Sequence, residues 1–221
     1  MSGDGRPASL ERPVEIDLAG VAVDGDLTVP AGAGGIVVFA HGSGSSRSSP
    51  RNRQVAQALQ QAGLGTLLID LLTADEEAVD RQTRALRFDI GLLAVRLAGA
   101  LAWVARHDAT AGLGACLFGA STGAAAALVA AARHPDDVRA VVSRGGRPDL
   151  AGAALKRVRA PTLLIVGGDD RQVLDLNRAA MRDLAAPHEL QVVPGATHLF
   201  EEPGTLDMVA ALAARWFTRH I

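Results

Sequence analysis

The chain alternates short apolar runs with longer segments of helical periodicity. The runs are five to seven residues long and rich in aliphatic side chains, and they occupy residues 36–40, 66–72, 113–119, 138–143, 162–168 and 189–195. Apolar runs that do not alternate with polar residues are typical of strands buried on both faces. Helical patterns follow them at residues 50–61, 86–106, 122–133, 149–155, 172–185 and 204–219. This alternation predicts βαβ crossovers and a mostly parallel sheet with helices on both faces.

The first thirty residues have a different pattern. Two stretches with a period of two, "VEIDLAGVAV" and "DLTVP", flank Asp24-Gly25. Asp-Gly between such runs is a strong hairpin signal, because both turn positions must tolerate positive φ. We therefore expect an α/β fold with about eight strands, opened by an N-terminal antiparallel hairpin.

Length and composition favour one domain. The chain has 221 residues, of which 48% are hydrophobic and 21% charged, which is ordinary for a single globular core. We predict a tail at residues 1–12 and one domain over residues 13–221. The widest region between elements, about eighteen residues after the sixth strand, is too short for a lid domain.

Charge and hydropathy restrict the partners. With 22 basic and 24 acidic side chains and a net charge of −2, no global field favours nucleic acid or an anionic membrane. The N-terminus has no apolar signal-peptide region, and residues 90–105 are interrupted by Arg96 and too short to span a bilayer. We expect a soluble, cytoplasmic protein with no membrane or nucleic-acid partner, whose oligomeric state the sequence leaves open.

The stretch "GASTG" between a predicted strand and a predicted helix contains the first candidate for catalysis. Gly119-Ala120-Ser121-Thr122-Gly123 fits G-x-S-x-G, in which a serine occupies a strained turn and its hydroxyl stands above the sheet. The glycines allow strand and helix to pass closely. The alternative is a tight turn without chemistry.

A serine nucleophile needs a base and a group that orients the base. Asp169 and Asp170 end a later strand, and His198 lies in the loop after the next one. The carboxyl ends of parallel strands share one edge of a sheet, so these side chains can meet Ser121 there. One aspartate could instead cap the following helix, and His198 could be an ordinary loop histidine.

In these residues the chain resembles the α/β-hydrolase superfamily, in its small, lidless, dienelactone-hydrolase-like branch. The resemblance covers nearly all of the chain after the first dozen residues and rests on "HGSGSS", "GASTG", "GGDD" and "GATHLF". In that superfamily the acid commonly stands three residues after a strand-ending glycine and three before an apolar residue. Gly167-x-x-Asp170-x-x-Val173 matches, which favours Asp170 over Asp169. Dienelactone hydrolases proper carry cysteine at the elbow, whereas this chain has Ser121 and its single cysteine, Cys116, inside the strand.

The loop "HGSGSSRSSPRN" follows the third strand and is rich in small polar residues. In this fold the loop supplies one backbone N–H to the oxyanion, and the residue after the nucleophile supplies the other. We expect Ser43 and Thr122 to be these donors and His41 to brace the loop. A phosphate-cradling loop is the competing interpretation, but the G-x-x-x-x-G-K-[ST] pattern is absent.

Arginines near the predicted catalytic edge are candidates for substrate binding. Arg144 and Arg147 follow the sixth strand, and Arg47 and Arg51 flank the oxyanion loop. A guanidinium suits a substrate carboxylate or phosphate, although salt bridges with Asp149 or Asp89, or a solvated loop, would account for these arginines at least as well.

The sequence thus predicts a serine hydrolase for a small-molecule ester or related acyl bond, possibly anionic, with Ser121, Asp170 and His198 as triad. We expect no cofactor and no metal. An acyltransferase or peptidase on the same triad, and a non-catalytic binding protein of the same fold, are the alternatives.

Overall fold

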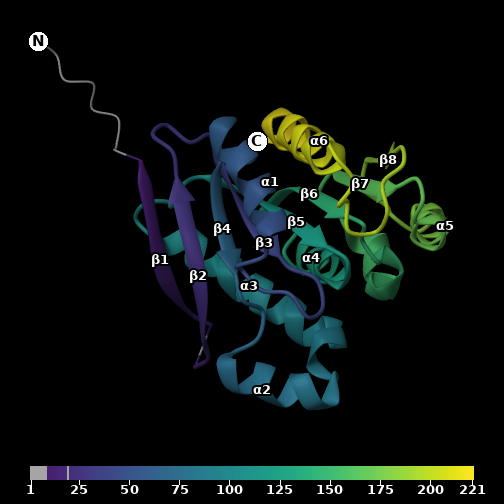
Figure 1. The fold of residues 1–221 in the computed structure, drawn as a ribbon. Coiled ribbons are helices and arrows are strands. Elements are labelled where there is room, and N and C mark those ends of the chain that lie inside the picture. Colours follow the sequence, from purple (N-terminus) through teal and green to yellow (C-terminus); the bar gives the residue numbers. More distant parts are fainter. Residues whose placement is uncertain (1–8, 19) are drawn as a thin grey trace, which may run out of the picture.

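The computed structural model describes residues 9–18 and 20–221. Their strands form one sheet in the order β1-β2-β4-β3-β5-β6-β7-β8 (Figure 1). The strands are β1 (Leu10–Asp17), β2 (Ala22–Val29), β3 (Gly35–Ala40), β4 (Gly65–Ile69), β5 (Gly114–Ala120), β6 (Val138–Arg144), β7 (Thr162–Gly167) and β8 (His188–Val193). β1 and β2 pair antiparallel, β2 pairs antiparallel with β4, and all strands from β4 to β8 in the sheet order are parallel. The predicted eight-stranded, mostly parallel sheet is confirmed.

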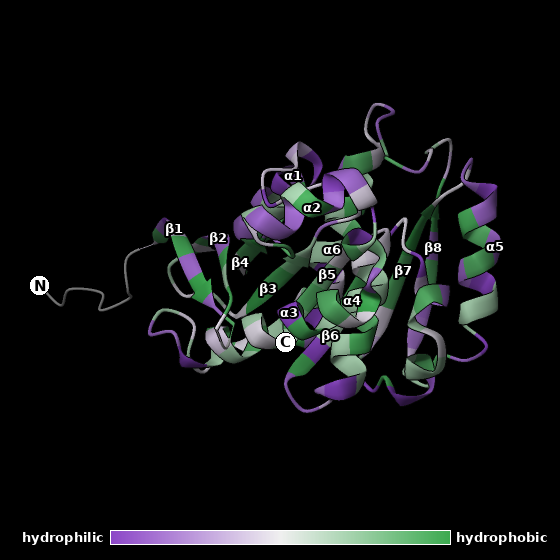
Figure 2. Cartoon of the chain, turned by 90° about the horizontal axis from the view of Figure 1, so that it is seen from below, coloured by the Kyte–Doolittle hydropathy of each residue, from purple (hydrophilic) through white to green (hydrophobic). Residues whose placement is uncertain are grey.

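Helices cover both faces of the sheet, as predicted. They are α1 (Pro50–Gln61), α2 (Ala74–Thr83), the 3-10 helix η1 (Leu86–Phe88), α3 (Ile90–Arg106), α4 (Thr122–Arg133), the 3-10 segment η2 (Pro148–Arg157), α5 (Arg171–Ala180) and α6 (Thr205–His220). α1 packs beside α6 on one face, and α3, α4 and η2 pack together on the other. Figure 2 shows hydrophobic residues along the central strands and hydrophilic ones on the outward side of α1. No described helix is long and apolar enough to cross a membrane.

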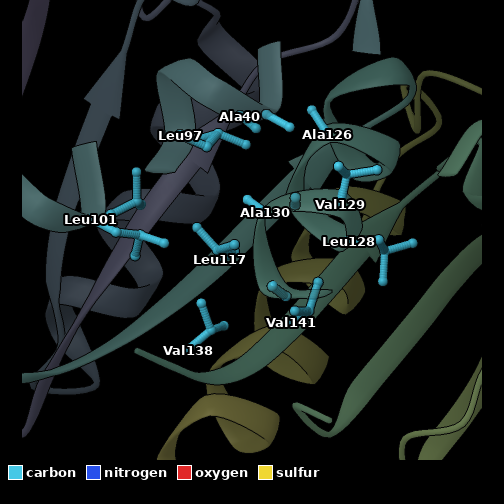
Figure 3. Close-up of a cluster of buried hydrophobic side chains, with 14 of the residues drawn as sticks. Ala40, Leu97, Leu101, Leu117, Ala126, Leu128, Val129, Ala130, Val138 and Val141 are labelled. Atoms are coloured by element: carbon cyan, nitrogen blue, oxygen red, sulfur yellow. The ribbon is translucent and has the colours of Figure 1, made fainter. Parts of the chain in front are cut away.

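The larger core cluster joins the centre of the sheet to α3 and α4 (Figure 3). Leu117 of β5 and Val141 of β6 are fully buried under Leu97 of α3 and Ala126 and Ala130 of α4. The small alanine side chains allow α4 to lie close to the sheet, which positions its first residue directly after the elbow on β5.

The predicted hairpin turn at Asp24-Gly25 is wrong. Both residues lie inside β2, where Gly25 pairs with Val14. The chain reverses earlier, between β1 and β2, where the Leu18 N–H donates to the Val21 carbonyl at 2.8 Å. The space around Gly25 is tight, because a Cβ there would lie 3.0 Å from Cδ1 of Ile16.

The N-terminal boundary also differs from the prediction. β1 begins at Leu10, so residues 10–12 belong to the sheet and not to a tail. Residues 1–8 lie outside the described residues.

The segment between β4 and β5 contains the α-helix α2 and the 3-10 helix η1 in addition to the predicted long helix. The acidic stretch forms α2, whose start is a capping box in which Thr73 Oγ1 accepts from the Glu76 N–H and the Glu76 carboxylate accepts from the Thr73 N–H. The long helix starts at Ile90 instead of residue 86, because the Asp89 carboxylate caps it by accepting from the Leu92 N–H at 2.9 Å. The sequence Thr73-x-x-Glu76 has the pattern of a capping box, so the start of α2 could have been predicted from the sequence.

Candidate active site

Ser121 stands at the turn between β5 and α4 in a backbone conformation that non-glycine residues rarely adopt, with φ 51° and ψ −118°. Such a conformation costs about 1–3 kcal/mol and persists only when its surroundings hold it. The Ser121 N–H donates to the Arg144 carbonyl at 3.2 Å, and the Ser121 carbonyl accepts from the Arg147 and Ala124 N–H groups, each at 3.1 Å. The end of β6 and the first turn of α4 therefore lock the turn.

Both glycines of the G-x-S-x-G stretch are needed because backbones pass close to them. A Cβ at Gly119 would lie 2.4 Å from Cα of Ala124, and a Cβ at Gly123 would lie 2.3 Å from the Ala40 carbonyl oxygen. Close passage of strand and helix, the role predicted for these glycines, is confirmed.

His198 and Asp170 form a short hydrogen bond. The distance from His198 Nδ1 to Asp170 Oδ2 is 2.6 Å, and the Asp170 side chain is only 13% exposed. Asp170 follows β7, and its N–H donates to the Gly167 carbonyl at 3.1 Å. Since Nδ1 faces the carboxylate, Nε2 is the ring nitrogen left to act as a base. Asp169 makes no side-chain hydrogen bond within the described part of the chain.

Ser121 and His198 line the same cavity, whose volume is about 140 Å³. Gly42 and Ser43 of the loop after β3 form another wall of it. A Cβ at Gly42 would lie 3.1 Å from Ser121 Cβ, so this loop passes directly against the elbow. Ser43 and Thr122 also border a second, smaller cavity on the other side of the loop. The structure thus brings four of the predicted residues together at the carboxyl edge of the sheet: Ser43, Ser121, Thr122 and His198. Asp170 joins them through its hydrogen bond to His198.

His41 braces the loop after β3, as predicted. Its Nε2 accepts from the Leu71 N–H at 3.1 Å, so Nδ1 carries the proton and donates to the Gly42 carbonyl at 2.9 Å. Burial lowers the pKa of His41, against the opposing effects of the Gly42 carbonyl and nearby carboxylates. A neutral ring is the form that both hydrogen bonds require.

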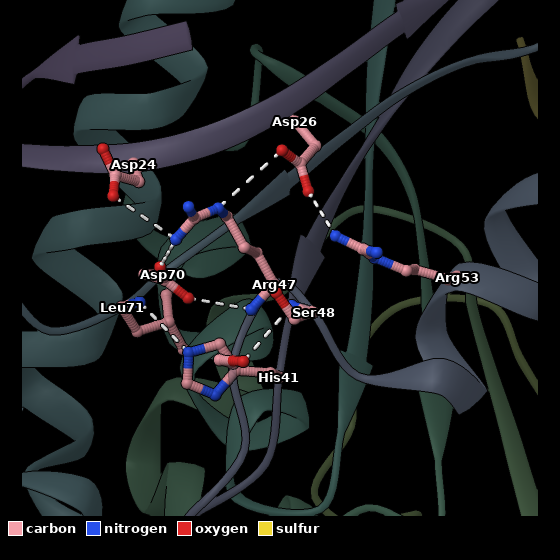
Figure 4. Close-up of polar contacts among 9 residues, drawn as sticks. Asp24, Asp26, His41, Arg47, Ser48, Arg53, Asp70 and Leu71 are labelled. Atoms are coloured by element: carbon pink, nitrogen blue, oxygen red, sulfur yellow. Dashed lines mark hydrogen bonds and ion pairs between the residues drawn. The ribbon is translucent and has the colours of Figure 1, made fainter. Parts of the chain in front are cut away.

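An ion-pair cluster anchors the same loop, and the sequence reasoning missed it (Figure 4). Arg47 lies among three carboxylates: Asp70, Asp24 at 3.4 Å and Asp26 at 3.7 Å. Burial lowers the pKa of Arg47, but the hydrogen bond to Asp70 and the charges of Asp70, Asp24 and Asp26 together raise it overall. Asp70 directly follows a strand, so its place at the same sheet edge as the loop could have been predicted. No sequence motif, however, indicates that it pairs with Arg47.

The two candidate arginines after β6 have different environments. Arg144 is 7% exposed and lines the cavity that contains Ser121 and His198. Arg147 forms a two-pronged pair with Asp149, with distances of 2.9 and 2.7 Å, and is not among the residues that line this cavity. The salt bridge considered from the sequence therefore accounts for Arg147 and leaves Arg144 as the substrate-facing candidate.

Cys116 does not have the environment of a nucleophile. It is fully buried in β5, and burial raises the pKa of its thiol to about 12. The thiolate, which is the reactive form, is absent at neutral pH. Among the residues with described positions, no three histidine, cysteine or acidic side chains gather in a way that could hold a metal ion.

The arrangement of the sheet, with the elbow after β5 and the acid and histidine after β7 and β8, is that of the α/β-hydrolase fold. The sequence profile described as "Dienelactone hydrolase family" matches residues 23–221. The chain therefore belongs to the dienelactone hydrolase family.

Individual relatives agree with this assignment. A solved structure titled as a dienelactone hydrolase from Anabaena variabilis is 57% identical, with a TM-score of 0.95 over 97% of this chain and 100% of that one. Est1E from Butyrivibrio proteoclasticus shares only the fold, with 15% identity and a TM-score of 0.78 over 94% of this chain and 98% of its own.

Two curated relatives from Mycobacterium tuberculosis have a name that does not refer to a hydrolase. Each is called "Putative phosphoribosyl transferase" and is 58% identical over 215 residues. The match covers 97% of this chain and 48% of each relative, so the chain spans about half their length.

Proposed function

We propose that this protein is a serine hydrolase that cleaves a carboxylic ester or a related acyl bond through an acyl-enzyme. The observation that carries the proposal is the 2.6 Å hydrogen bond between His198 and Asp170, made beside a cavity that His198 shares with the strained Ser121. A base oriented by a carboxylate and a serine raised on a sharp turn are the two parts that acyl transfer by serine requires.

In the first half of the reaction, His198 Nε2 takes the proton of the Ser121 hydroxyl as Oγ attacks the carbonyl carbon. Asp170 holds the ring through Nδ1 and stabilises the imidazolium that forms. The tetrahedral intermediate then collapses, the bond to the leaving alcohol breaks, and the alcohol departs with the proton from His198. Water repeats the sequence on the acyl-enzyme, releasing the acid and restoring Ser121.

Negative charge on the carbonyl oxygen needs fixed donors. Thr122 is the first residue of α4, so its N–H has no partner inside the helix and the positive end of the helix dipole lies behind it. Ser43 supplies the second N–H from the loop that passes against the elbow. Loss of one such donor typically costs about 10²- to 10³-fold in kcat.

The alternatives differ in what the acyl-enzyme reacts with, or whether it forms at all. A transferase would pass the acyl group to an alcohol or amine in place of water, and a peptidase would start from an amide. The name of the M. tuberculosis relatives describes proteins about twice the matched length, so it can belong to the half of those relatives that lies outside the match.

A fluorophosphonate label with peptide mapping tests the nucleophile. We expect covalent labelling on the peptide that contains Ser121 and none in Ser121→Ala. Labelling elsewhere, or a folded wild type that does not label, would reject the assignment and favour a non-catalytic binding protein. A series of p-nitrophenyl esters of increasing chain length, assayed with and without added alcohols and amines, then separates hydrolysis from transfer.

A further inference from the structure

Arg144 is a buried cation that lies in the candidate active site and has no anionic partner among the residues that the structure describes. It ends β6, lines the cavity with Ser121 and His198, and is 7% exposed. Its Nε and Nη1 atoms have no hydrogen-bond partner, and it makes no ion pair, within residues 9–18 and 20–221. Its guanidinium carbon lies 6.0 Å from the centre of the Phe200 ring, which is a weak substitute for a carboxylate. Burying a charge without a partner is costly, so this arrangement is explained if a ligand supplies the missing anion.

Arg144 stays charged despite its burial. Burial, and secondarily the nearby charge of Arg51, lowers its pKa to about 10. The guanidinium is therefore still protonated at neutral pH and can still donate hydrogen bonds to an anion.

Arg51 is a second guanidinium on the same cavity. It belongs to the first turn of α1, and its Nε is buried without a hydrogen-bond partner among the described residues. Its Nη1 is 3.0 Å from Glu201, but that side chain is 62% exposed, so solvent screens the pair. Arg51 and Arg144 repel each other across the cavity, and Glu201 offsets the charge of Arg51 alone.

Polar groups from α1 and the loop before it complete the wall. Ser45, Ser49 and Asn52 line the cavity between the two arginines and the oxyanion loop. Ser49 is the N-cap of the twelve-residue helix α1 and Asn52 belongs to its first turn, where the helix dipole favours negative charge. Donors from β6 and from α1 approach from different elements, an arrangement that suits an anion with acceptor oxygens pointing in several directions.

We propose that Arg144 and Arg51 bind a phosphate group carried by the substrate. The preferred substrate is then a carboxylic ester or other acyl compound that also carries a phosphomonoester group. This inference deepens the proposed function and rests on it. A phosphomonoester carries about −1.5 to −2 charges at pH 7 and three acceptor oxygens, which complements two guanidinium groups better than a carboxylate with one charge. The phosphate takes no part in bond making; it holds the substrate while Ser121 attacks the carbonyl carbon.

A binding experiment tests the anion site without any turnover. Ser121→Ala protein, prepared without phosphate buffer, is titrated with inorganic phosphate in a calorimeter, with acetate as the planar control anion. We expect saturable phosphate binding that is at least about 10-fold tighter than acetate binding. Adding Arg144→Gln should abolish it and adding Arg51→Gln should weaken it, whereas Arg147→Gln, whose arginine is paired with Asp149, should leave it unchanged. Absent binding, or binding that survives Arg144→Gln, overturns the proposal.

A turnover experiment then connects the site to specificity. Three p-nitrophenyl esters of similar length are compared: neutral butyrate, the half-ester of succinate, and 3-phosphooxypropanoate. We expect the phosphorylated ester to have a kcat/KM about 10- to 150-fold above the neutral one, mainly through KM. The preference should vanish in Arg144→Gln, be partly retained in Arg144→Lys and be intact in Arg147→Gln.

The outcomes separate the two proposals. Equal or greater preference for the succinate half-ester, or no preference among the three, overturns the phosphate assignment while leaving the serine hydrolase intact. If no ester is cleaved and no label is taken up, the proposed function fails, and the calorimetric titration still decides whether the anion site exists.

Discussion

The carboxylate of Asp70 holds Arg47 at two points. Oδ1 accepts from the Arg47 backbone N–H at 2.8 Å, and Oδ2 accepts from the Arg47 guanidinium. Because Asp70 follows β4 and Arg47 belongs to the loop after β3, the contact joins that loop to the end of the neighbouring strand. One residue after Asp70, the Leu71 N–H holds His41 of the same loop. Strand β4 thus positions both ends of the segment that contains Ser43.

Asp70→Ala should therefore impair catalysis although Asp70 does not line the cavity with Ser121. Small displacements of a positioned group can cost about 10²-fold in rate, and we expect kcat to fall about 10- to 100-fold with little change in KM. Steady-state kinetics on a neutral ester measure both. Asp26→Ala is the matched control, since Asp26 approaches the Arg47 side chain and binds Arg53 but does not hold the loop backbone. A rise in KM at constant kcat would show that the loop binds substrate instead of the oxyanion.

Replacement of Ser121 should separate activity from stability. Both Ser121→Ala and Ser121→Gly should lose esterase activity, since neither has a nucleophile. The glycine variant should be the more stable of the two by about 1 kcal/mol. Glycine tolerates the positive φ, which costs other residues about 1–3 kcal/mol. The larger backbone entropy that glycine loses on folding cancels only part of that gain. Urea unfolding of the two variants gives the difference. An alanine variant that is equally or more stable would mean that the elbow is not strained.

The two adjacent aspartates should differ in their effect on turnover. Asp170→Asn removes the charge that orients His198, whereas Asp169→Asn changes a side chain without a hydrogen bond among the described residues. By analogy with the loss of a triad carboxylate, Asp170→Asn should lower kcat by up to about 10⁴-fold, and Asp169→Asn should lower it far less. The order of the two kcat values is the measurement, and the reverse order would make Asp169 the acid.

His41 should contribute to the pH dependence of folding. Burial lowers its pKa in the folded protein below the unfolded value of 6.5. As the pH falls below this value, the unfolded chain takes up a proton that folded His41 does not, so the free energy of unfolding decreases. His41→Gln keeps an acceptor for Leu71 but cannot be protonated, and its stability should decline less between pH 7.5 and 5.5.

Urea unfolding at several pH values across this range provides the comparison. A slope in His41→Gln as steep as in the wild type would mean that His41 is not held neutral.

Much of the fold was predictable because its signals are local. Each buried parallel strand is a short apolar run, and alternation with helices follows directly from it. Gly119 and Gly123 around Ser121 mark a place where strand and helix backbones nearly touch, and the same constraint holds in any chain that makes this turn. The placement of Ser121, Asp170 and His198 at one edge of the sheet could likewise be predicted, because each follows its own strand.

The remaining features depend on residues that are distant in the sequence. Asp24-Gly25 has the composition of a turn, yet Gly25 lies in a strand, where it pairs with Val14 of β1 on one side and Ile69 of β4 on the other. Arg144 and Arg147 are equivalent in the sequence, but Asp149 neutralises one, and the end of β6 buries the other beside Ser121. Asp70 becomes an anchor only because β4 lies next to β3 in the sheet. Burial and charge pairing are properties of the packed chain, and no local pattern of residues specifies them.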